Sequence, residues 1–158
     1  MIFSIIYFWY LNSDVFCILF YIFILLLQKT KEMIVLTGAA GFIGSVLLKE
    51  LNNKGINDIV ISDDFSDIEK NRNFENKSFI DKVHRNELAT WLDENSNRVD
   101  FIIHIGARTD TTEFDKSVFD MLNLNYTKNI WEKCTLHNIP LIYASSAATD
   151  GLGAYGYI

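Results

Sequence analysis

The chain has 158 residues and a formal net charge of −6 at pH 7, a length that suits one domain with a single core. The acidic balance and the lack of a basic cluster exclude a nucleic-acid-binding role that depends on a positive surface. Cys17 and Cys134 lie outside any CxxC or Cys/His spacing, so no metal site is expected and Cys134 is interpreted as a reduced, packed thiol.

Residues 1–32 differ in composition from the rest of the chain. Residues 2–11 and 15–27 are apolar runs, and a short polar stretch that includes Asp14 separates them. Together they reach the length of a membrane anchor if Asp14 is tolerated. We favour a second interpretation, translation of AT-rich DNA upstream of a true start at Met33, because Met33 falls where a strand-first nucleotide-binding domain would begin. A cytoplasmic location is then expected, with membrane contact only if residues 1–27 belong to the protein.

From Met33 the sequence predicts a strand, a glycine turn and a helix. Residues 33–36 are apolar, as in a buried parallel strand, and Gly38, Gly41 and Gly44 follow before a helix over residues 42–53. The apolar positions of this helix are Val46, Leu47, Leu48 and Leu51. In this context the glycines predict a dinucleotide-binding unit: they allow a tight turn, the approach of a pyrophosphate and close helix packing. The helix N-terminus offers free N–H groups to phosphates.

Two carboxylates follow the next predicted strand. Residues 58–62 form this strand, and Asp63 and Asp64 come after it, about twenty residues beyond the glycine turn, where a carboxylate accepts hydrogen bonds from the adenosine ribose. A carboxylate here favours NAD, because it would repel a 2′-phosphate. Lys70 and Arg72 follow closely and could neutralise such a phosphate, so NADP stays open.

The rest of the chain alternates between strand and helix patterns. The predicted elements are a loop or short helix over 65–77, a third strand at 79–80, a helix over 86–92, a fourth strand over 99–105, a loop over 106–112, a long helix over 113–137 and a fifth strand over 141–144. This alternation predicts an α/β fold, a Rossmann-like doubly wound parallel sheet. Ligands bind at the carboxyl ends of the strands in such sheets. His104, inside an apolar run, is interpreted as a packed, hydrogen-bonded histidine.

Three motifs resemble a known family. The segment TGAAGFIG, residues 37–44, resembles the cofactor fingerprint of extended short-chain dehydrogenase/reductases. Two further segments, HIGARTDTTE at 104–113 and YASSAAT at 143–149, are more specific. Together the three are similar to the ADP-glyceromanno-heptose 6-epimerases, a family of sugar-nucleotide epimerases. The resemblance covers residues 33–158 and none of residues 1–32.

The resemblance implies roles for the matching residues. The implied pyrophosphate contacts are Gly38, Gly41, Phe42, Ile43 and Gly44. The implied contacts at the adenosine ribose end are Asp63, Asp64, Lys70 and Arg85. The implied lining of the cofactor beyond the fourth strand is Ile105, Gly106, Ala107, Arg108, Thr109 and Asn123. Ser146 matches the serine that hydrogen-bonds the reacting hydroxyl, with Ser145 beside it and Thr111 as a further candidate substrate contact. A surface arginine is an equally good interpretation of Arg108.

The family also implies a reaction and partners. It inverts C6″ of ADP-glyceromanno-heptose, a lipopolysaccharide core precursor, by oxidation and re-reduction with NADP, or in some cases NAD, and the full-length protein is expected to be a homo-oligomer. A Tyr-x-x-x-Lys pair supplies the acid/base. This pair is not found before Ile158, and Asp150 replaces a family tyrosine. We therefore expect the cofactor-binding part of an epimerase, inactive alone. A non-catalytic NAD(P)-binding module and a membrane-anchored family member are the alternatives.

Overall fold

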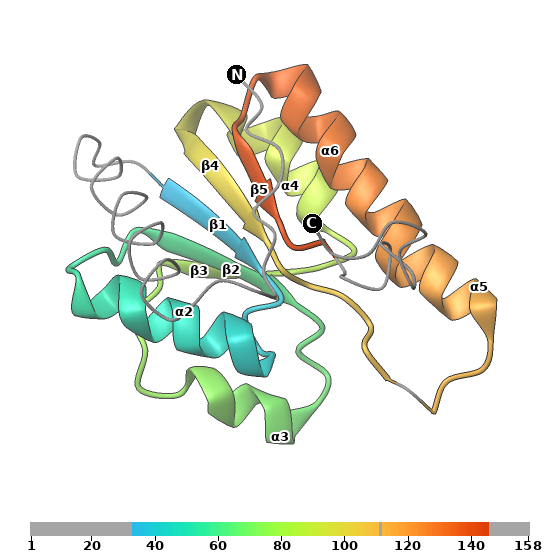
Figure 1. Cartoon of the computed structure of the whole chain (residues 1–158). Helices are drawn as coiled ribbons and strands as arrows, with labels where there is room; N and C mark the ends of the chain where they lie inside the picture. Colours follow the sequence, from blue (N-terminus) through green and yellow to red (C-terminus); the bar gives the residue numbers. More distant parts are fainter. Residues whose placement is uncertain (1–32, 111, 146–158) are drawn as a thin grey trace, which may run out of the picture.

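The computed structural model describes residues 33–110 and 112–145, and it builds them around one parallel β-sheet (Figure 1). The strands are β1 Met33–Thr37, β2 Ile59–Asp63, β3 Asp81–His84, β4 Val99–His104 and β5 Leu141–Tyr143. Their order in the sheet is β3-β2-β1-β4-β5, and every neighbouring pair is parallel. The order reverses between β1 and β4, which is the topological switch point of a doubly wound fold. The predicted fold class is confirmed.

Helices cover both faces of this sheet. They are α2 Phe42–Asn53, α3 Ile68–Asn71, α4 Leu88–Asn95, α5 Lys116–Phe119 and α6 Tyr126–His137. Short 3₁₀ turns lie at Arg72–Phe74 and Ser96–Arg98, and a π-helical segment, Asp120–Asn125, joins α5 to α6. Figure 1 shows α2 and α3 on one side of the sheet and α4 and α6 on the other. The site can therefore open only at the strand ends, between these two layers.

Alternation along β1 divides the core into two halves. Ile34 and Leu36 pack with Leu48 and Leu51 of α2. Met33 and Val35 face the opposite layer, where the buried helix residues are Leu88 and Leu92 of α4 and Ile130 and Cys134 of α6. Full burial of a leucine stabilises a fold by about 1.5–3 kcal/mol. The central strand is thus fixed from both sides, and so is the position of the turn that follows it.

The prediction of the third strand was wrong by two residues. Phe79 and Ile80 precede β3, and the ring of Phe79 packs edge-on against Phe74, with 5.9 Å between ring centroids. Within β3 only Val83 is buried. Among the described strands, β3 pairs only with β2, so it is an edge strand with little apolar character. A search of the sequence for apolar runs therefore selects Phe79 and Ile80, which precede the strand, instead of β3 itself.

Two helix predictions also need correction. The long helix begins at Lys116 rather than at residue 113, because the Asp115 side chain caps it by accepting a hydrogen bond from the Ser117 N–H at 2.9 Å. In α2, Val46 is 47 % exposed and lies outside the buried stripe. Within the described residues, no helix has the length and apolar character needed to cross a bilayer. The expectations for residues 1–32, Thr111, Ser146 and Asp150 lie outside the described residues.

Candidate functional site

The turn after β1 touches the loop after β4. Gly38 has a φ of +72°, and its N–H donates to the Ser62 carbonyl oxygen at 2.8 Å. A Cβ at Gly38 would lie 2.6 Å from the Cα of Gly106. The left-handed conformation and this contact both require glycine. The structure therefore brings two predicted site residues, Gly38 and Gly106, together at the switch point of the sheet.

The N-terminus of α2 is arranged for an anion. A Cβ at Gly44 would lie 2.0 Å from the Gly38 carbonyl oxygen, so the helix packs directly on the turn. Gly41 is the N-cap and provides no side-chain cap. The N–H groups of Phe42, Ile43 and Gly44 belong to the first helical turn, where no intrahelical acceptor is available. Together with the helix dipole, they form a ready site for a phosphate group.

The carboxylate of Asp63 ties the end of β2 to the glycine turn. Its Oδ2 accepts the Ala40 N–H at 2.8 Å, and its Oδ1 accepts the Asp64 N–H at 2.7 Å. The Nδ2 group of Asn73 donates to the Ala40 carbonyl oxygen at 2.8 Å, so Ala40 is held on both sides. A carboxylate offers about four lone-pair positions, so Asp63 can still accept hydrogen bonds from ribose hydroxyls. The sequence pattern did not identify Asn73 as a site residue, because most of its neighbours are also polar.

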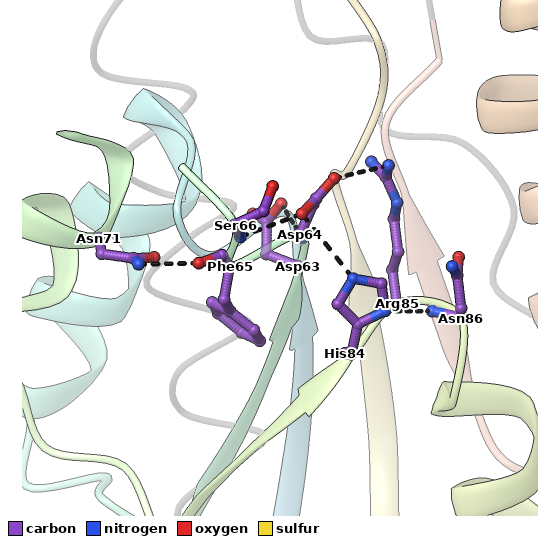
Figure 2. A network of polar contacts seen from close by, with 8 residues as sticks. All are labelled: Asp63, Asp64, Phe65, Ser66, Asn71, His84, Arg85 and Asn86. Atoms are coloured by element: carbon purple, nitrogen blue, oxygen red, sulfur yellow. Dashed lines mark hydrogen bonds and ion pairs between the residues drawn. The ribbon is translucent and has the colours of Figure 1, made fainter. Parts of the chain in front are cut away.

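Asp64 lies beside His84, the last residue of β3, and Arg85, which follows it (Figure 2). Arg85 Nη2 is 2.8 Å from Asp64 Oδ2, and His84 Nε2 is 3.8 Å from Asp64 Oδ1. Hydrogen bonds from Ser66 and, to a smaller extent, the positive charge of Arg85 lower the pKa of Asp64. Asp64 and Arg85, both predicted site residues, are therefore an ion pair. Lys70 is an exposed residue of α3.

The loop after β4 is fixed by an asparagine. Asn123 Oδ1 accepts the Arg108 N–H at 2.7 Å, and Asn123 Nδ2 donates to the Arg108 carbonyl oxygen at 3.0 Å. The Arg108 guanidinium forms an ion pair with Asp110 at 2.8 Å. The other predicted lining residues differ in exposure: Ile105 is half-buried against the α2 side of the core, whereas Ala107 and Thr109 are exposed. The Asn123 side chain thus holds the loop in place through the backbone of Arg108.

Replacing Asn123 by alanine removes both hydrogen bonds to the Arg108 backbone. We expect a loss of about 1 kcal/mol in the free energy of unfolding and faster amide hydrogen exchange in residues 106–110. Asn125→Ala, at an exposed position of the same π-helical segment, is the matched control. Unchanged exchange of the Arg108 amide in Asn123→Ala would show that the loop is held by other contacts.

A buried polar chain lies beneath the switch point. Thr37 Oγ1 is 2.6 Å from His104 Nδ1, and His104 Nε2 is 2.9 Å from Thr127 Oγ1. The ring of Tyr126 packs edge-on against the imidazole at 5.5 Å. Burial lowers the pKa of His104 to about 4, so its imidazole is neutral at pH 7. The interpretation of His104 as a packed, hydrogen-bonded residue is confirmed, whereas its two threonine partners were not predicted.

The remaining candidates contribute less to this site. Ser145 is exposed and follows β5 at the same edge of the sheet. Cys134 is a buried residue of α6, and burial raises the pKa of its thiol to about 12, so the interpretation of a packed thiol is confirmed. Across residues 33–110 and 112–145, no group of three or more His, Cys, Asp or Glu side chains is arranged to hold a metal ion.

The sequence matches the model of one protein family over residues 34–155, described as the NAD dependent epimerase/dehydratase family. The chain belongs to this family.

Two curated relatives show which members of the family this chain resembles. An ADP-L-glycero-D-manno-heptose-6-epimerase of Fusobacterium nucleatum is 42 % identical over 127 residues, which is 79 % of this chain and 38 % of that protein. The protein of the same name from Brachyspira hyodysenteriae is 40 % identical over 130 residues, covering 79 % of this chain and 40 % of that protein. The chain therefore spans about two fifths of the length of the curated relatives it matches.

Solved structures share the fold. The Helicobacter pylori ADP-L-glycero-D-manno-heptose-6-epimerase superposes with a TM-score of 0.64 at 23 % identity, over 80 % of this chain and 43 % of that one. The Brucella ovis UDP-glucose 4-epimerase, solved in complex with NAD, gives a TM-score of 0.60 at 25 % identity, over 76 % and 37 % of the two chains. The NAD dependence named in the family's description agrees with the free N–H groups at the N-terminus of α2.

Proposed function

We propose that this chain is the cofactor-binding part of a sugar-nucleotide epimerase that acts on ADP-glyceromanno-heptose. The observation that carries the proposal is the glycine turn, where Gly44 packs α2 against the Gly38 carbonyl oxygen and leaves the first helical turn open to a pyrophosphate. The names of the relatives at 40–42 % identity support this choice of substrate. Residues 33–158 would then form the cofactor-binding domain.

The residues present fit a nicotinamide dinucleotide. The N–H groups of residues 42–44 would hold the pyrophosphate, and Asp63 would accept hydrogen bonds from the adenosine ribose while it keeps Ala40 in place. The loop over 105–109, held by Asn123, would line the remainder of the cofactor. When bound, the nicotinamide accepts and returns a hydride, which allows oxidation and re-reduction at C6″.

We propose NADP as the cofactor, with NAD also accepted; the family resemblance and the exposed Lys70 beyond Asp64 support this choice. Ser146 would hydrogen-bond the reacting hydroxyl, with Ser145 and Thr111 beside the substrate. The role of Ser146 is to orient the substrate alcohol, which general acid–base catalysis requires.

Isothermal titration of the full chain with NADP and with NAD tests the cofactor proposal. We expect both to bind, NADP more tightly, and we expect Gly41→Val to reduce both affinities at least tenfold by placing a side chain where the pyrophosphate approaches. Val46→Ala, which shortens an exposed side chain on the same helix, is the control and should bind like the unmodified chain. Absence of binding to either dinucleotide would contradict the proposal.

A further inference from the structure

A row of polar side chains crosses the sheet directly below the glycine turn. Thr37 at the end of β1 is the register partner of Ser62 on β2 and of His104 on β4. All three residues are buried, with at most 3 % of their surface exposed. Side chains two places apart in a strand share a face, so these three face the layer of α4 and α6, as do the residues two places before them: Val35, Val60 and Ile102. Figure 1 shows α6 on this side of the sheet.

His104 links this row to the glycine turn on one side and to α6 on the other. Its Nδ1 is 2.6 Å from Thr37 Oγ1, the hydroxyl oxygen that also accepts the Gly106 N–H at 3.4 Å. Thr37 directly precedes Gly38, so the start of the turn and the loop after β4 meet at one hydroxyl group. On the other side of the ring, Nε2 is 2.9 Å from Thr127 Oγ1 in the first turn of α6.

The hydrogen atoms of this chain can be placed so that each of its members has a partner. Burial lowers the pKa of His104 to about 4, so at pH 7 one ring nitrogen donates and the other accepts. A hydroxyl group has one proton and two lone pairs. Thr37 can therefore accept from Gly106 and donate to Nδ1, which leaves the imidazole proton on Nε2 for Thr127. Loss of either threonine hydroxyl leaves a buried ring nitrogen without its partner, which costs more than the hydrogen bond itself.

The same helix holds the loop after β4 at a second point. Asn123, four residues before Thr127 and so about one helical turn away, binds both backbone groups of Arg108. The π-helical segment continues directly into α6, so both side chains belong to one continuous helical body. This helix therefore fixes the end of β4 through His104 and the loop through Arg108. Through His104, the contact of Thr127 extends further, to Thr37 and the glycine turn.

We propose that His104 is a positioning residue for dinucleotide binding, which uses its two threonine contacts to hold the glycine turn and the loop after β4 at the spacing that the cofactor requires. The inference rests on the proposed function of this site. His104 is buried and faces α6, so it acts through Thr37 and Gly106 and does not touch the ligand. A Cβ at Gly38 would lie 2.6 Å from the Gly106 Cα. Because the two backbones are this close, a small shift of Thr37 moves both sides of the site together.

The test is Thr127→Val in the full chain, titrated with NAD by isothermal calorimetry. Valine keeps the shape of threonine and removes the hydroxyl that faces His104. We expect the NAD dissociation constant to rise about fivefold, with faster hydrogen exchange of the Gly106 amide in the absence of ligand. Thr135→Val is the matched control, because it makes the same change at an exposed position of α6, where the hydroxyl donates to the Trp131 carbonyl oxygen at 2.9 Å. It should alter neither quantity.

Two substitutions at His104 separate positioning from a merely structural role. Glutamine has a donor and an acceptor that can meet both threonines, so His104→Gln should bind NAD within about twofold of the unmodified chain. His104→Leu should lose as much affinity as Thr127→Val. In the His104→Leu background, Thr127→Val should have no further effect, because the contact is already absent. Thr37→Val replaces His104→Leu in this cycle if the latter does not fold.

Three results would overturn the proposal. The first is a folded Thr127→Val that binds NAD as tightly as Thr135→Val. The second is an effect of Thr127→Val that persists in the His104→Leu background, and the third is a loss in His104→Gln as large as that in His104→Leu. If the unmodified chain binds no dinucleotide, the proposed function fails and this inference fails with it. A negative result confined to the variants leaves the proposed function intact.

Discussion

Replacing Gly44 by alanine is expected to lower the free energy of unfolding by about 3 kcal/mol, the upper part of the range for added bulk in a packed interior. The new Cβ would lie 2.0 Å from the Gly38 carbonyl oxygen and 2.9 Å from the Ala39 Cα. Both neighbours are backbone atoms, so α2 must move away from the turn. The core between α2 and the sheet opens with it, and dinucleotide affinity should fall in parallel.

Gly41→Ala is the comparison that separates stability from binding. Its Cβ would lie 3.2 Å from the same oxygen, a contact that a shift of a few tenths of an ångström relieves. We expect a loss below about 1 kcal/mol in urea unfolding, but a clear loss of dinucleotide affinity. If Gly44→Ala unfolds at the same urea concentration as Gly41→Ala, the close contact between α2 and the turn does not limit the fold.

Sequence patterns correctly predicted β1 and α2, whose positions are set by residues close together in the sequence. The apolar run at Met33 gave β1, and α2 spans Phe42–Asn53 as predicted, because the turn, the helix start and the buried stripe all lie within one short segment. The prediction of β3 was wrong because an edge strand is defined by its partner and not by its own composition. Asp81 and Lys82 are exposed there, and only their pairing with β2 makes them strand residues.

In the candidate site, too, a local pattern could predict some residues, whereas others depend on distant parts of the chain. The glycine turn and Asp63 were predictable because a known spacing joins them. The contacts that shape the site join residues far apart in sequence, through short polar side chains with no periodicity: Asn73 to Ala40, Asn123 to Arg108 and Thr127 to His104. Each becomes recognisable only once the strand order is known, since the sheet brings these segments to one edge.

The buried His104 is expected to make the protein sensitive to mild acid. The pKa of an ordinary histidine is 6.5, and burial lowers the pKa of His104 to about 4. The unfolded chain therefore binds a proton between these values while the folded chain does not. The stability contributed by neutral His104 is fully present above pH 6.5, and it is lost as the pH falls from 6.5 to about 4. The shift corresponds to about 3 kcal/mol over this range.

Urea unfolding from pH 7 to pH 4, followed by tryptophan fluorescence, measures this loss. Trp91 and Trp131 pack against the half of the core that contains α4 and α6, so they report on the layer next to His104. His104→Gln can still bridge the two threonines but has no titrating group, and its stability should vary much less over this range. His137→Gln, a histidine on the far end of α6 paired with Asp93, should keep the acid sensitivity. An equal loss in His104→Gln would assign it to other groups.

Three aspartates whose pKa values are lowered contribute to the pH dependence only below this range. Hydrogen bonds from Ser66, Thr112 and Ser117 lower the pKa of Asp64, Asp110 and Asp115, respectively, below the ordinary value of 3.8. The stability that these carboxylates contribute is present above that value and is lost only as the pH falls further. A loss between pH 6.5 and 4 therefore points to an imidazole that must take up a proton inside the core. His104 is the histidine in that position, since His84 and His137 are both more exposed.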